Sequence, residues 1–400
     1  MPTRSPWPLL LELAERLDAA QVAYTFVEST ALMMQGVAVP PLAAIDLIVQ
    51  WDLFDAVHAL FAADGAGPVA QTENRAAFQF TRDGFTVNVA CLYNTVVAAD
   101  PERVPVAHEG RQLWVRSLLS YRRRTAPGDP HRDLITARLR QLQADLTAHN
   151  AAAWSLEPYD AWVQRHGNPP ELAERLKQEP AARLASLLPY LGELKGKRVI
   201  NLMGSHGAKA VAMALLGAEV TVVDISPENA RYATALADAA GVPLRYVVSD
   251  VLALPGAERT ADYDLVLLEL GILHYFIDLE PLTRLVAELL ADRGRLVLQD
   301  FHPISKLISL KGHKHKVSGN YFNPLPERVP VAYHKYSPGD PAAPYVLERR
   351  WTLGEVATAV ADAGLHIEQL VEEPNTRLAD VGIPKTFTVV ASKLPRPAAP

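Results

Sequence analysis

The stretch INLMGSHGAKAVAMALLGAEVTVVDIS, residues 200–226, decides the fold of the second half of the chain. An apolar strand runs into a glycine turn, a helix follows, and a second strand ends at Asp224. Strands that alternate with helices form a parallel sheet covered on both faces, and right-handed crossovers make it a doubly wound α/β fold. The alternation predicts strands at 197–203, 219–225, 244–250, 263–271 and 295–301, and helices at 208–217, 227–241 and 279–294.

The alternation stops after residue 301. Residues 302–345 form an irregular segment too long for a plain connection, which indicates a lid or a substrate loop. A helix at 352–365 and strands at 366–373 and 386–393 follow. Two consecutive strands without a helix between them predict an antiparallel pair at the edge of the sheet.

The chain is expected to form two domains, because 400 residues are many for a single core. A helical pattern ends around 144–156, so we place the boundary between 1–148 and 149–400. The single cysteine, Cys91, excludes a disulfide framework and a cysteine zinc site.

The charge balance and the N-terminus limit the partners of the protein. A net charge of −6 argues against a nucleic-acid partner. The N-terminal apolar residues are interrupted at helical spacing by Glu12, Glu15 and Arg16, which predicts an amphipathic helix rather than a signal peptide. We therefore expect a cytoplasmic protein with no membrane partner, and the sequence leaves homo-oligomerisation open.

Gly204 and Gly207 lie where the first strand of the second half meets its helix. Glycine permits a tight turn and the close approach of a ligand, and the helix N-terminus offers free N–H groups. Asp224 comes 20 residues after Gly204, the spacing at which an acid accepts hydrogen bonds from a ribose diol. Ser249 and Asp250 end the third strand beside the same crevice, within reach of an adenine amino group. An α/β domain that merely needs a tight turn is the alternative.

Two cofactor classes fit such a crevice. A nicotinamide or flavin dinucleotide favours G-x-G-x-x-G, whose backbone cradles a pyrophosphate. The run from Met203 to Gly207 reads MGSHG, one glycine short of that motif. S-adenosylmethionine has no pyrophosphate and does not need the cradle, so the turn favours it.

Residues 154–394 resemble the class I S-adenosylmethionine-dependent methyltransferases, in particular the small-molecule branch with the ubiquinone and menaquinone methyltransferases. The matching motifs are NLMGSHG, VTVVDIS, VVSDVL, YDLVLLELGILHYF, DFHPIS, WTLGEVATAVADAGL and GIPKTFTVVASK. The chain departs from the family pattern at Asn201, where an acid is usual, and at Ser205, where a glycine is usual. The resemblance implies a Rossmann-like methyltransferase sheet with S-adenosyl-L-methionine as the cofactor. The residues that it implies for cofactor binding are Asn201, Gly204, Ser205, Gly207, Asp224, Ile225, Ser249, Asp250, Val251, Glu269 and Tyr159.

Methyl transfer requires an acceptor in line with the sulfonium and, for a poor nucleophile, a base. His302, beside Asp300 after the fifth strand, is a candidate base or orienting residue, with a place in the substrate wall as its alternative. His274 after the fourth strand is a second candidate, with a helix cap or packing as its alternative. Tyr333 in the lid is the third, with lid packing as its alternative.

Further side chains of the second half could contact a ligand. His313 and His315 alternate with lysines without a nearby carboxylate, which favours a solvated loop over a metal pair, and no metal site is predicted. Aromatic residues before the first strand could fold over the cofactor or pack in the core. The remaining candidates are Trp154, Trp162, Tyr275 and Tyr321.

The first 148 residues predict a smaller α+β domain, with a helix at 51–65 among its elements. This domain loosely resembles the minimal nucleotidyltransferases over residues 8–142. Such enzymes need two acids one residue apart and a third on a neighbouring strand to hold Mg²⁺. The corresponding positions hold Ala44, Asp46 and Asn88. One acid of three cannot hold two metals, so this domain is expected to have lost the reaction.

The sequence therefore predicts methyl transfer from S-adenosyl-L-methionine to a small-molecule acceptor. The alternatives are an NAD(P)-dependent oxidoreductase and a non-catalytic protein that binds S-adenosylmethionine or a nucleotide for regulation. RNA methylation is disfavoured by the acidic balance and by the absence of a basic, aromatic-rich stretch. The sequence leaves open whether oxygen, nitrogen or carbon is methylated.

Overall fold

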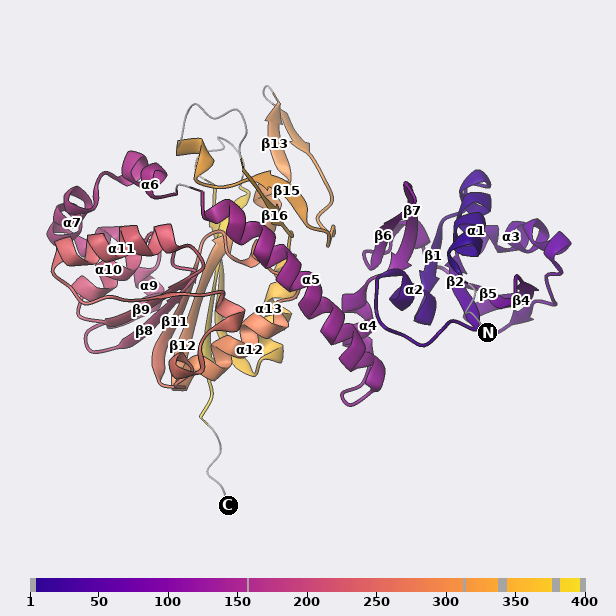
Figure 1. The fold of residues 1–400 in the computed structure, drawn as a ribbon, viewed down its shortest axis with the longest axis horizontal. Coiled ribbons are helices and arrows are strands. Elements are labelled where there is room, and N and C mark those ends of the chain that lie inside the picture. Colours follow the sequence, from indigo (N-terminus) through magenta and orange to yellow (C-terminus); the bar gives the residue numbers. More distant parts are fainter. Residues whose placement is uncertain (1–4, 157, 312–313, 337–343, 376–381, 396–400) are drawn as a thin grey trace, which may run out of the picture. The chain divides into compact units, whose positions relative to one another are not determined.

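The computed structural model describes residues 5–156, 158–311, 314–336, 344–375 and 382–395 (Figure 1). The chain divides into two compact units, Met1–Leu142 and Gln143–Pro400. Helix α5 (Pro130–Trp154) runs through this division without a break, so the boundary expected near 148 lies inside a helix. The run AHNAAAW does not end the helix, because alanine favours helical backbone more than any other residue.

The first unit is built on a mixed seven-stranded sheet in the order β3-β4-β5-β2-β1-β7-β6. Its core gathers the apolar residues of the amphipathic first helix, such as Leu10, Leu13 and Leu17, with alternate residues of the strands. Its strands are β1 (Tyr24–Val27), β2 (Ala44–Val49), β3 (Ala70–Gln71), β4 (Arg75–Arg82), β5 (Phe85–Leu92), β6 (Arg103–His108) and β7 (Arg111–Arg116). Its helices before α5 are α1 (Trp7–Ala19), α2 (Glu28–Met34), α3 (Phe54–Leu60) and α4 (Leu118–Arg124).

Asp46 and Asn88 face each other on the adjacent parallel strands β2 and β5. The Asn88 amide donates a 2.8 Å hydrogen bond to the Asp46 carboxylate. The backbone N–H of Asp46 in turn donates to the Thr30 hydroxyl of α2. The acid of the expected degenerate site is therefore bound within the sheet by the amide that stands in the third position.

The second unit contains the predicted α/β sheet, in the order β10-β9-β8-β11-β12-β18-β17. Every strand runs parallel to its neighbours except β18, which lies antiparallel between β12 and β17. The predicted antiparallel pair at the edge is thus confirmed. The strands are β8 (Arg198–Leu202), β9 (Glu219–Asp224), β10 (Arg245–Val248), β11 (Tyr263–Glu269), β12 (Leu290–Phe301), β17 (Leu365–Pro374) and β18 (Pro384–Lys393).

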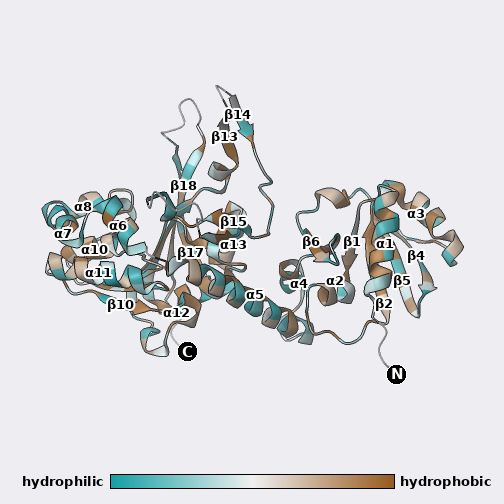
Figure 2. Cartoon of the chain, turned by 45° about the horizontal axis from the view of Figure 1, so that its top comes forward, coloured by the Kyte–Doolittle hydropathy of each residue, from teal (hydrophilic) through white to brown (hydrophobic). Residues whose placement is uncertain are grey.

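Two core clusters cover the two faces of this sheet. On β8, Val199 packs with α10 (Ala208–Leu215) and α11 (Pro227–Ala240), whereas Ile200 packs with α12 (Glu280–Leu289) and α13 (Leu353–Asp362). Successive residues of a strand point to opposite faces, so the near-continuous apolar strands supply both clusters. Figure 2 shows the hydrophobic colour concentrated along the strands, and many hydrophilic residues along α5.

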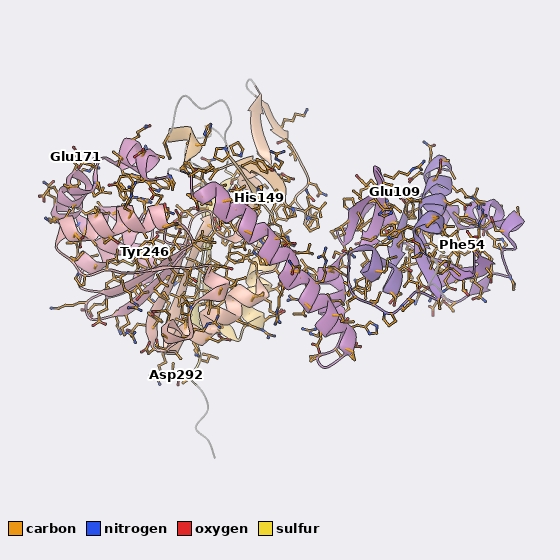
Figure 3. All side chains as sticks on the ribbon, in the orientation of Figure 1. Phe54, Glu109, His149, Glu171, Tyr246 and Asp292 are labelled. Atoms are coloured by element: carbon orange, nitrogen blue, oxygen red, sulfur yellow. The ribbon has the colours of Figure 1, made fainter. Side chains whose placement is uncertain are left out.

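Four helices that the sequence pattern did not predict precede β8, and two of them are only four residues long. They are α6 (Pro158–His166), α7 (Pro169–Gln178), α8 (Pro180–Arg183) and α9 (Leu188–Leu191). Helix α7 begins with a capping box between Asn168 and Glu171. Figure 3 marks Glu171 on α7 and His149 on α5.

Three predicted elements differ from the structure. The helix expected at 279–294 ends at Leu289, because Leu290 leaves helical geometry and pairs with Tyr263. The helix expected at 51–65 is split into η1 (Trp51–Leu53), α3 and η2 (Ala62–Asp64). The segment 302–345 is not irregular throughout. It holds η7 (Pro303–Lys306), the hairpin of β13 (Ile308–Lys311) and β14 (Lys314–Val317), β15 (Glu327–Pro330), η8 (His334–Tyr336) and the start of β16 (Tyr345–Glu348).

Within the described ranges, no helix combines the length and the apolar character needed to cross a membrane.

Candidate active site

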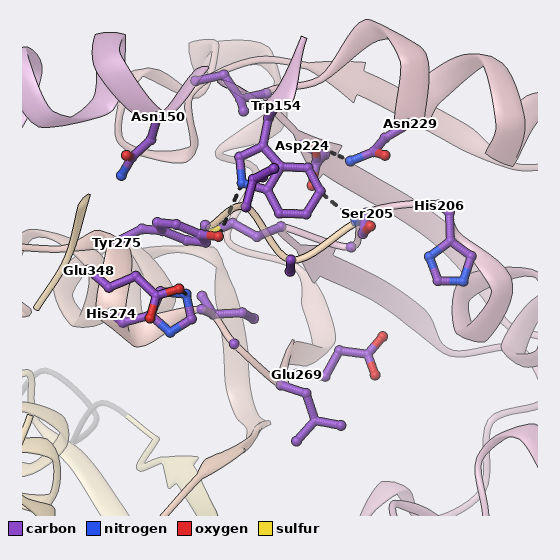
Figure 4. A pocket seen from close by; sticks show the side chains of 18 of the residues that line it. Asn150, Trp154, Ser205, His206, Asp224, Asn229, Glu269, His274, Tyr275 and Glu348 are labelled. Carbon is purple, nitrogen blue, oxygen red and sulfur yellow. Dashed lines mark hydrogen bonds and ion pairs between the residues drawn. The ribbon is translucent and has the colours of Figure 1, made fainter. Parts of the chain in front are cut away.

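A cavity of about 650 Å³ lies at the carboxyl ends of β8, β9, β10 and β11 (Figure 4). This is the edge at which open parallel sheets bind their ligands. The C-terminal turns of α5 and the β15–β16 segment complete its wall. The predicted residues that line it are Gly204, Ser205, Asp224, Ile225, Ser249, Asp250, Val251, Glu269 and His274.

The glycine turn joins β8 to α10 beneath this cavity. A Cβ on Gly204 would lie 2.6 Å from Oδ1 of Asn201, and a Cβ on Gly207 would lie 2.6 Å from Cβ of Ala233 on α11. Both distances are too short for real atoms, so each glycine is required by packing. Ser205 itself has a positive φ of 50°, and its carbonyl accepts a hydrogen bond from the Tyr246 hydroxyl (labelled in Figure 3).

Asn201 and Gly207 are not among the described residues that line the cavity. Asn201 is fully buried in β8, and its amide donates to the carbonyl of Leu267 on β11 at 3.3 Å. The cofactor contact that the family resemblance implies for Asn201 therefore has no counterpart in the described lining.

Asp224 ends β9 with its carboxylate at the cavity. It accepts hydrogen bonds of 3.0 Å from the backbone N–H groups of Ser205 and Ser226 and from the amide of Asn229. Burial raises the pKa of this carboxyl, and the hydrogen bonds from Ser226, Asn229 and Ser205 oppose that shift. A carboxylate offers about four acceptor positions, so it can bind a further donor beside these three.

Asp250 follows β10 at the same edge. Its carboxylate accepts the backbone N–H of Leu252 at 3.0 Å, and burial raises the pKa of the carboxyl. The hydroxyl of Ser249 donates to the carbonyl of Asp250. The ends of β9 and β10 thus present two acids to one cavity, as the sequence predicted.

Aromatic side chains form a second wall. The Trp154 indole donates to the Tyr275 hydroxyl at 3.1 Å, and the Trp162 indole donates to the side-chain oxygen of Asn229 at 2.8 Å. Trp154, Trp162 and Tyr275 all line the cavity, and Figure 4 shows Trp154 beside Asp224. Tyr159 is absent from the described lining and packs instead against Tyr232, with the Arg231 guanidinium over its ring.

Ionisable side chains also line the cavity beyond the turn, and the sequence reasoning missed Arg183, His206 and Lys209 among them. Lys209 of α10 forms an ion pair with Glu269 at the end of β11. Arg183 of α8 donates to Nε2 of His206 at 3.3 Å, so the His206 proton lies on Nδ1. Burial, followed by the nearby charges of His166 and Arg183, places the pKa of His206 well below its usual value. Among the described residues, neither Nε of Arg183 nor Nδ1 of His206 has a hydrogen-bond partner.

Of the three predicted catalytic residues, His274 lines the cavity and the other two do not. His302 caps η7 by accepting the backbone N–H of Ile304, and its Nε2 lies 2.8 Å from the Glu372 carboxylate on β17. Burial lowers the pKa of His302, against the opposing effect of Glu372. Tyr333 is buried and donates to the carbonyl of Ala153 at 2.7 Å. Proximity to a strand end did not specify the direction of either side chain.

Asp300, the neighbour of His302, has a role that the sequence did not indicate. Its carboxylate accepts the backbone N–H groups of Gly271, Ile272 and Leu273 at 2.6–3.1 Å. It thereby fixes the loop that carries His274. Tyr321 accepts the backbone N–H of Leu353. His313 and the side chain of His315 lie outside the described residues, and the rest of the described chain holds no cluster of three metal-binding side chains.

The comparisons with known proteins find a methyltransferase domain within the second unit. Residues 203–298 match the family described as "Methyltransferase domain". An uncharacterized protein of Mycobacterium tuberculosis is 33% identical over 135 residues, which is 33% of this chain and 42% of the relative. The ubiquinone biosynthesis O-methyltransferase of Xanthomonas euvesicatoria is 34% identical over 106 residues, 26% of this chain and 44% of the relative. The chain thus spans less than half the length of the curated relatives that it matches.

Among solved structures, an S-adenosylmethionine-dependent methyltransferase from Mesorhizobium loti is similar, with a TM-score of 0.42 and 21% identity. The similarity covers 53% of this chain and 97% of that one. The magnesium protoporphyrin IX methyltransferase of Synechocystis is similar with a TM-score of 0.38 and 17% identity, over 63% of this chain and 99% of that one.

Proposed function

With the methyltransferase domain in the second unit as the premise, we propose that this protein transfers a methyl group from S-adenosyl-L-methionine to a small-molecule acceptor. The observation that carries the proposal is the single cavity that gathers the glycine turn, Asp224 and Asp250 at the carboxyl ends of neighbouring strands. When bound, the cofactor supplies an electrophilic methyl group on a sulfonium. The residues of the chain supply its binding, its orientation and the exclusion of water.

The donors and acceptors along the cavity fit the parts of this cofactor. Asp224 has acceptor capacity left for a ribose diol, and Asp250 at the next strand can accept from an adenine amino group. The unpartnered buried N–H groups of Arg183 and His206 suit the methionyl carboxylate. Trp154 and Tyr275 cover the cavity with apolar surface, which lowers water access to the reacting atoms.

The acceptor is proposed to be small and partly apolar. The lining of the cavity includes the apolar residues Ile272, Phe276, Val329 and Val331. Sites for drug-sized ligands have this size and this mixture of apolar wall with few polar groups. The ubiquinone and menaquinone branch of the family and a cytoplasmic location remain part of the proposal.

The first unit is proposed to be a nucleotidyltransferase-like domain without catalysis. The hydrogen bond from Asn88 to Asp46 supports this, because the acid is engaged by an amide at the place where a third acid would hold a metal. A role in binding a substrate, a nucleotide or a second copy of the chain is compatible with that loss.

The first test is calorimetric titration of the full chain with S-adenosylmethionine and S-adenosylhomocysteine. We expect micromolar binding of both, weakened roughly 10- to 100-fold in Asp224→Asn, since a hydrogen bond to a charged group contributes about 1.5–3 kcal/mol. Asp262→Asn is the matched control, because Asp262 is an acid on the same unit that pairs with Arg198 and does not line the cavity. Binding of NAD(P) in place of both ligands would favour the oxidoreductase alternative and end the proposal.

A further inference from the structure

Among the residues that line the cavity, His274 forms a pair with Glu348, which lies beyond the family match that ends at residue 298. Nε2 of His274 lies 3.3 Å from Oε1 of Glu348, and the two side chains are only 16% and 11% exposed. Both line the cavity, and Figure 4 shows them below Tyr275. His274 comes from η6 (Leu273–Tyr275), and Glu348 ends β16, 74 residues later in the chain.

Gln143 of α5 holds the segment that carries His274. Its amide donates to the carbonyl of Tyr275 at 3.0 Å, and its side-chain oxygen accepts the backbone N–H of Ile277 at 2.8 Å. Gln143 is only 8% exposed and lines the cavity.

Asn150 of α5 holds the strand that carries Glu348. Its amide donates to the carbonyl of Leu347 at 3.0 Å, and its side-chain oxygen accepts the N–H of the same residue at 2.8 Å. This two-bond exchange is the pattern of a hydrogen-bonded pair in an antiparallel ladder, made here by a side chain. Gln143 and Asn150 are seven residues apart, which places them on one face of the helix two turns apart.

The two held segments are also joined to each other. The N–H of Arg349 donates to the carbonyl of His274 at 2.8 Å, and the Trp351 indole donates to the carbonyl of Leu273 at 2.8 Å. Both backbones of the pair are therefore fixed, which is what a precise interaction between the two side chains requires.

We propose that the His274–Glu348 pair removes the proton of a hydroxyl acceptor, so that the protein is an O-methyltransferase of small phenols or enols, and that Gln143 and Asn150 position this pair. The proposal rests on the proposed function and deepens it. A neutral hydroxyl is a poor nucleophile and gains most from a base, whereas a neutral amine already presents its lone pair. A buried histidine beside a carboxylate, under the aromatic side chains of Trp154 and Tyr275, suits a flat apolar ring with an acidic O–H.

The step is balanced without a further reactant. The O–H proton of the acceptor moves to the imidazole of His274, and the carboxylate of Glu348 stabilises the imidazolium. The oxygen electron pair forms the bond to the methyl carbon, and the carbon–sulfur bond breaks with its electrons left on sulfur. The proton leaves His274 to solvent after the product departs.

Other ionisable groups surround the pair. Tyr275 is adjacent on the loop, and burial together with Glu348 raises its pKa far above the usual value. Asp300 of β12 binds the loop N–H groups, and Arg349 beyond β16 forms an ion pair with Glu355. None of these groups ordinarily titrates near neutral pH, but His206 and His334 also line the cavity, so only a loss of activity on acidification that disappears in His274→Gln reports this histidine.

The experiment compares 2-naphthol with 2-naphthylamine, two probes of equal shape that differ in O–H against NH₂, together with catechol and 4-hydroxybenzoate. S-adenosylhomocysteine formation and product mass are measured from pH 5 to 9. We expect methylation of the hydroxyl probes only, with kcat falling on acidification as the imidazole takes up a proton. We expect His274→Gln to lower kcat roughly 100- to 10,000-fold and to abolish the acid limb, and Glu348→Gln to lower kcat at least tenfold.

The positioning residues are tested by Gln143→Met and Asn150→Leu, which keep side-chain size and remove the paired hydrogen bonds. Each is expected to lower kcat roughly tenfold, with the acceptor KM within about twofold and the acid limb retained. Asn150→Asp keeps the acceptor for Leu347 N–H and should recover part of kcat. Asp145→Asn, at an exposed position of the same helix, is the control.

Calorimetric S-adenosylmethionine binding by every variant separates folding from catalysis. Absence of binding by the wild-type chain would end the proposed function itself. With binding intact, the inference is overturned by methylation of the amine, by failure of all three hydroxyl probes, or by an acid limb that persists in His274→Gln.

Discussion

At the scale of single residues, the glycine turn is determined by contacts that the sequence could show only as glycine letters. Gly207 has a φ of 72°, and a side chain there would meet Ala233 of α11. Gly241 at the end of α11 has the same φ of 72° but open space around it. Substitution at these two positions therefore distinguishes the cost of a left-handed backbone from the cost of a steric clash with a neighbouring helix.

We predict that Gly207→Ala lowers the free energy of unfolding by about 2–4 kcal/mol, because left-handed backbone and overpacking both add a cost. Gly241→Ala, which carries only the backbone cost, should lose about 1 kcal/mol. Urea unfolding followed by circular dichroism measures both. Adding Ala233→Gly to Gly207→Ala should restore part of the loss. Equal losses for the two alanine variants would show that the contact with α11 is unimportant.

The sequence predicts the positions of the cofactor residues better than those of the catalytic residues. Asp224, Ser249 and Asp250 line the cavity as expected, because parallel strands end at one edge of a sheet whatever their side chains do. His302 and Tyr333 do not, because each is bound to a partner remote in the sequence, Glu372 and the carbonyl of Ala153. Such partners leave no local pattern.

At the scale of elements, α6 and the glycine turn are joined by a stack of rings. The His206 ring contacts Trp162, at a centroid distance of 4.7 Å, and His166, at 4.6 Å, and these two rings lie 6.0 Å from each other. Burial and the nearby arginines lower the pKa of His166 to about 4, and the pKa of His206 moves in the same direction. The helix is thus attached to the turn by two histidines that remain uncharged in the folded protein at neutral pH.

We predict a loss of stability as the pH falls from 7 to 5. An unfolded histidine takes up its proton near pH 6.5, whereas folded His166 does so only near pH 4, so the unfolded state binds more protons in this range. The contribution of this residue is complete above pH 6.5 and is lost on acidification until about pH 4. The measurement is the urea midpoint at pH 7 and pH 5.

His166→Phe keeps an aromatic ring in the stack without its titration, and should reduce the difference between the two midpoints. His131→Gln, at an exposed histidine of the first unit, serves as the control and should leave the difference unchanged. An unaltered difference in His166→Phe would contradict the assignment.

The strands and helices of the α/β core were predictable because their apolar periodicity is local. The four helices from α6 to α9 were not, because they are short and two consist of four residues each. The missed site residue Arg183 belongs to one of these. The predicted helix at 279–294 extends beyond α12 because Leu290 and Ala291 favour helical backbone, whereas the pairing of Leu290 with Tyr263 is a tertiary contact.

At the scale of the whole molecule, each unit has its own seven-stranded sheet, and only the second carries the methyltransferase domain. The sequence predicted two domains from length and pattern. It could not predict the division at Leu142, because α5 continues through that position without a break. A local helical pattern does not show which hydrophobic core a helix packs against.

For the first unit we predict that Asn88→Asp lowers the free energy of unfolding by about 1–3 kcal/mol, since a hydrogen bond of 2.8 Å would be replaced by two adjacent carboxylates. Asn88→Ala, which removes the bond without adding charge, should cost less. Thermal unfolding with and without 5–10 mM Mg²⁺, roughly the range that fills weak cation sites, is the measurement. A rise in Tm of the wild-type chain on adding Mg²⁺ would contradict the loss of the metal site.

The side-chain clamps of α5 have a consequence for the order of events during synthesis. The partner of Asn150, Leu347, is synthesised 197 residues later. At a translation rate of about 5–20 residues per second, that interval is on the order of 10–40 s. Throughout it, Asn150 lacks the backbone partner that it has in the folded chain, whereas the segment that Gln143 binds, with Tyr275 and Ile277, is synthesised before Leu347. One wall of the cavity therefore stays incomplete in the nascent chain for far longer than a helix takes to form.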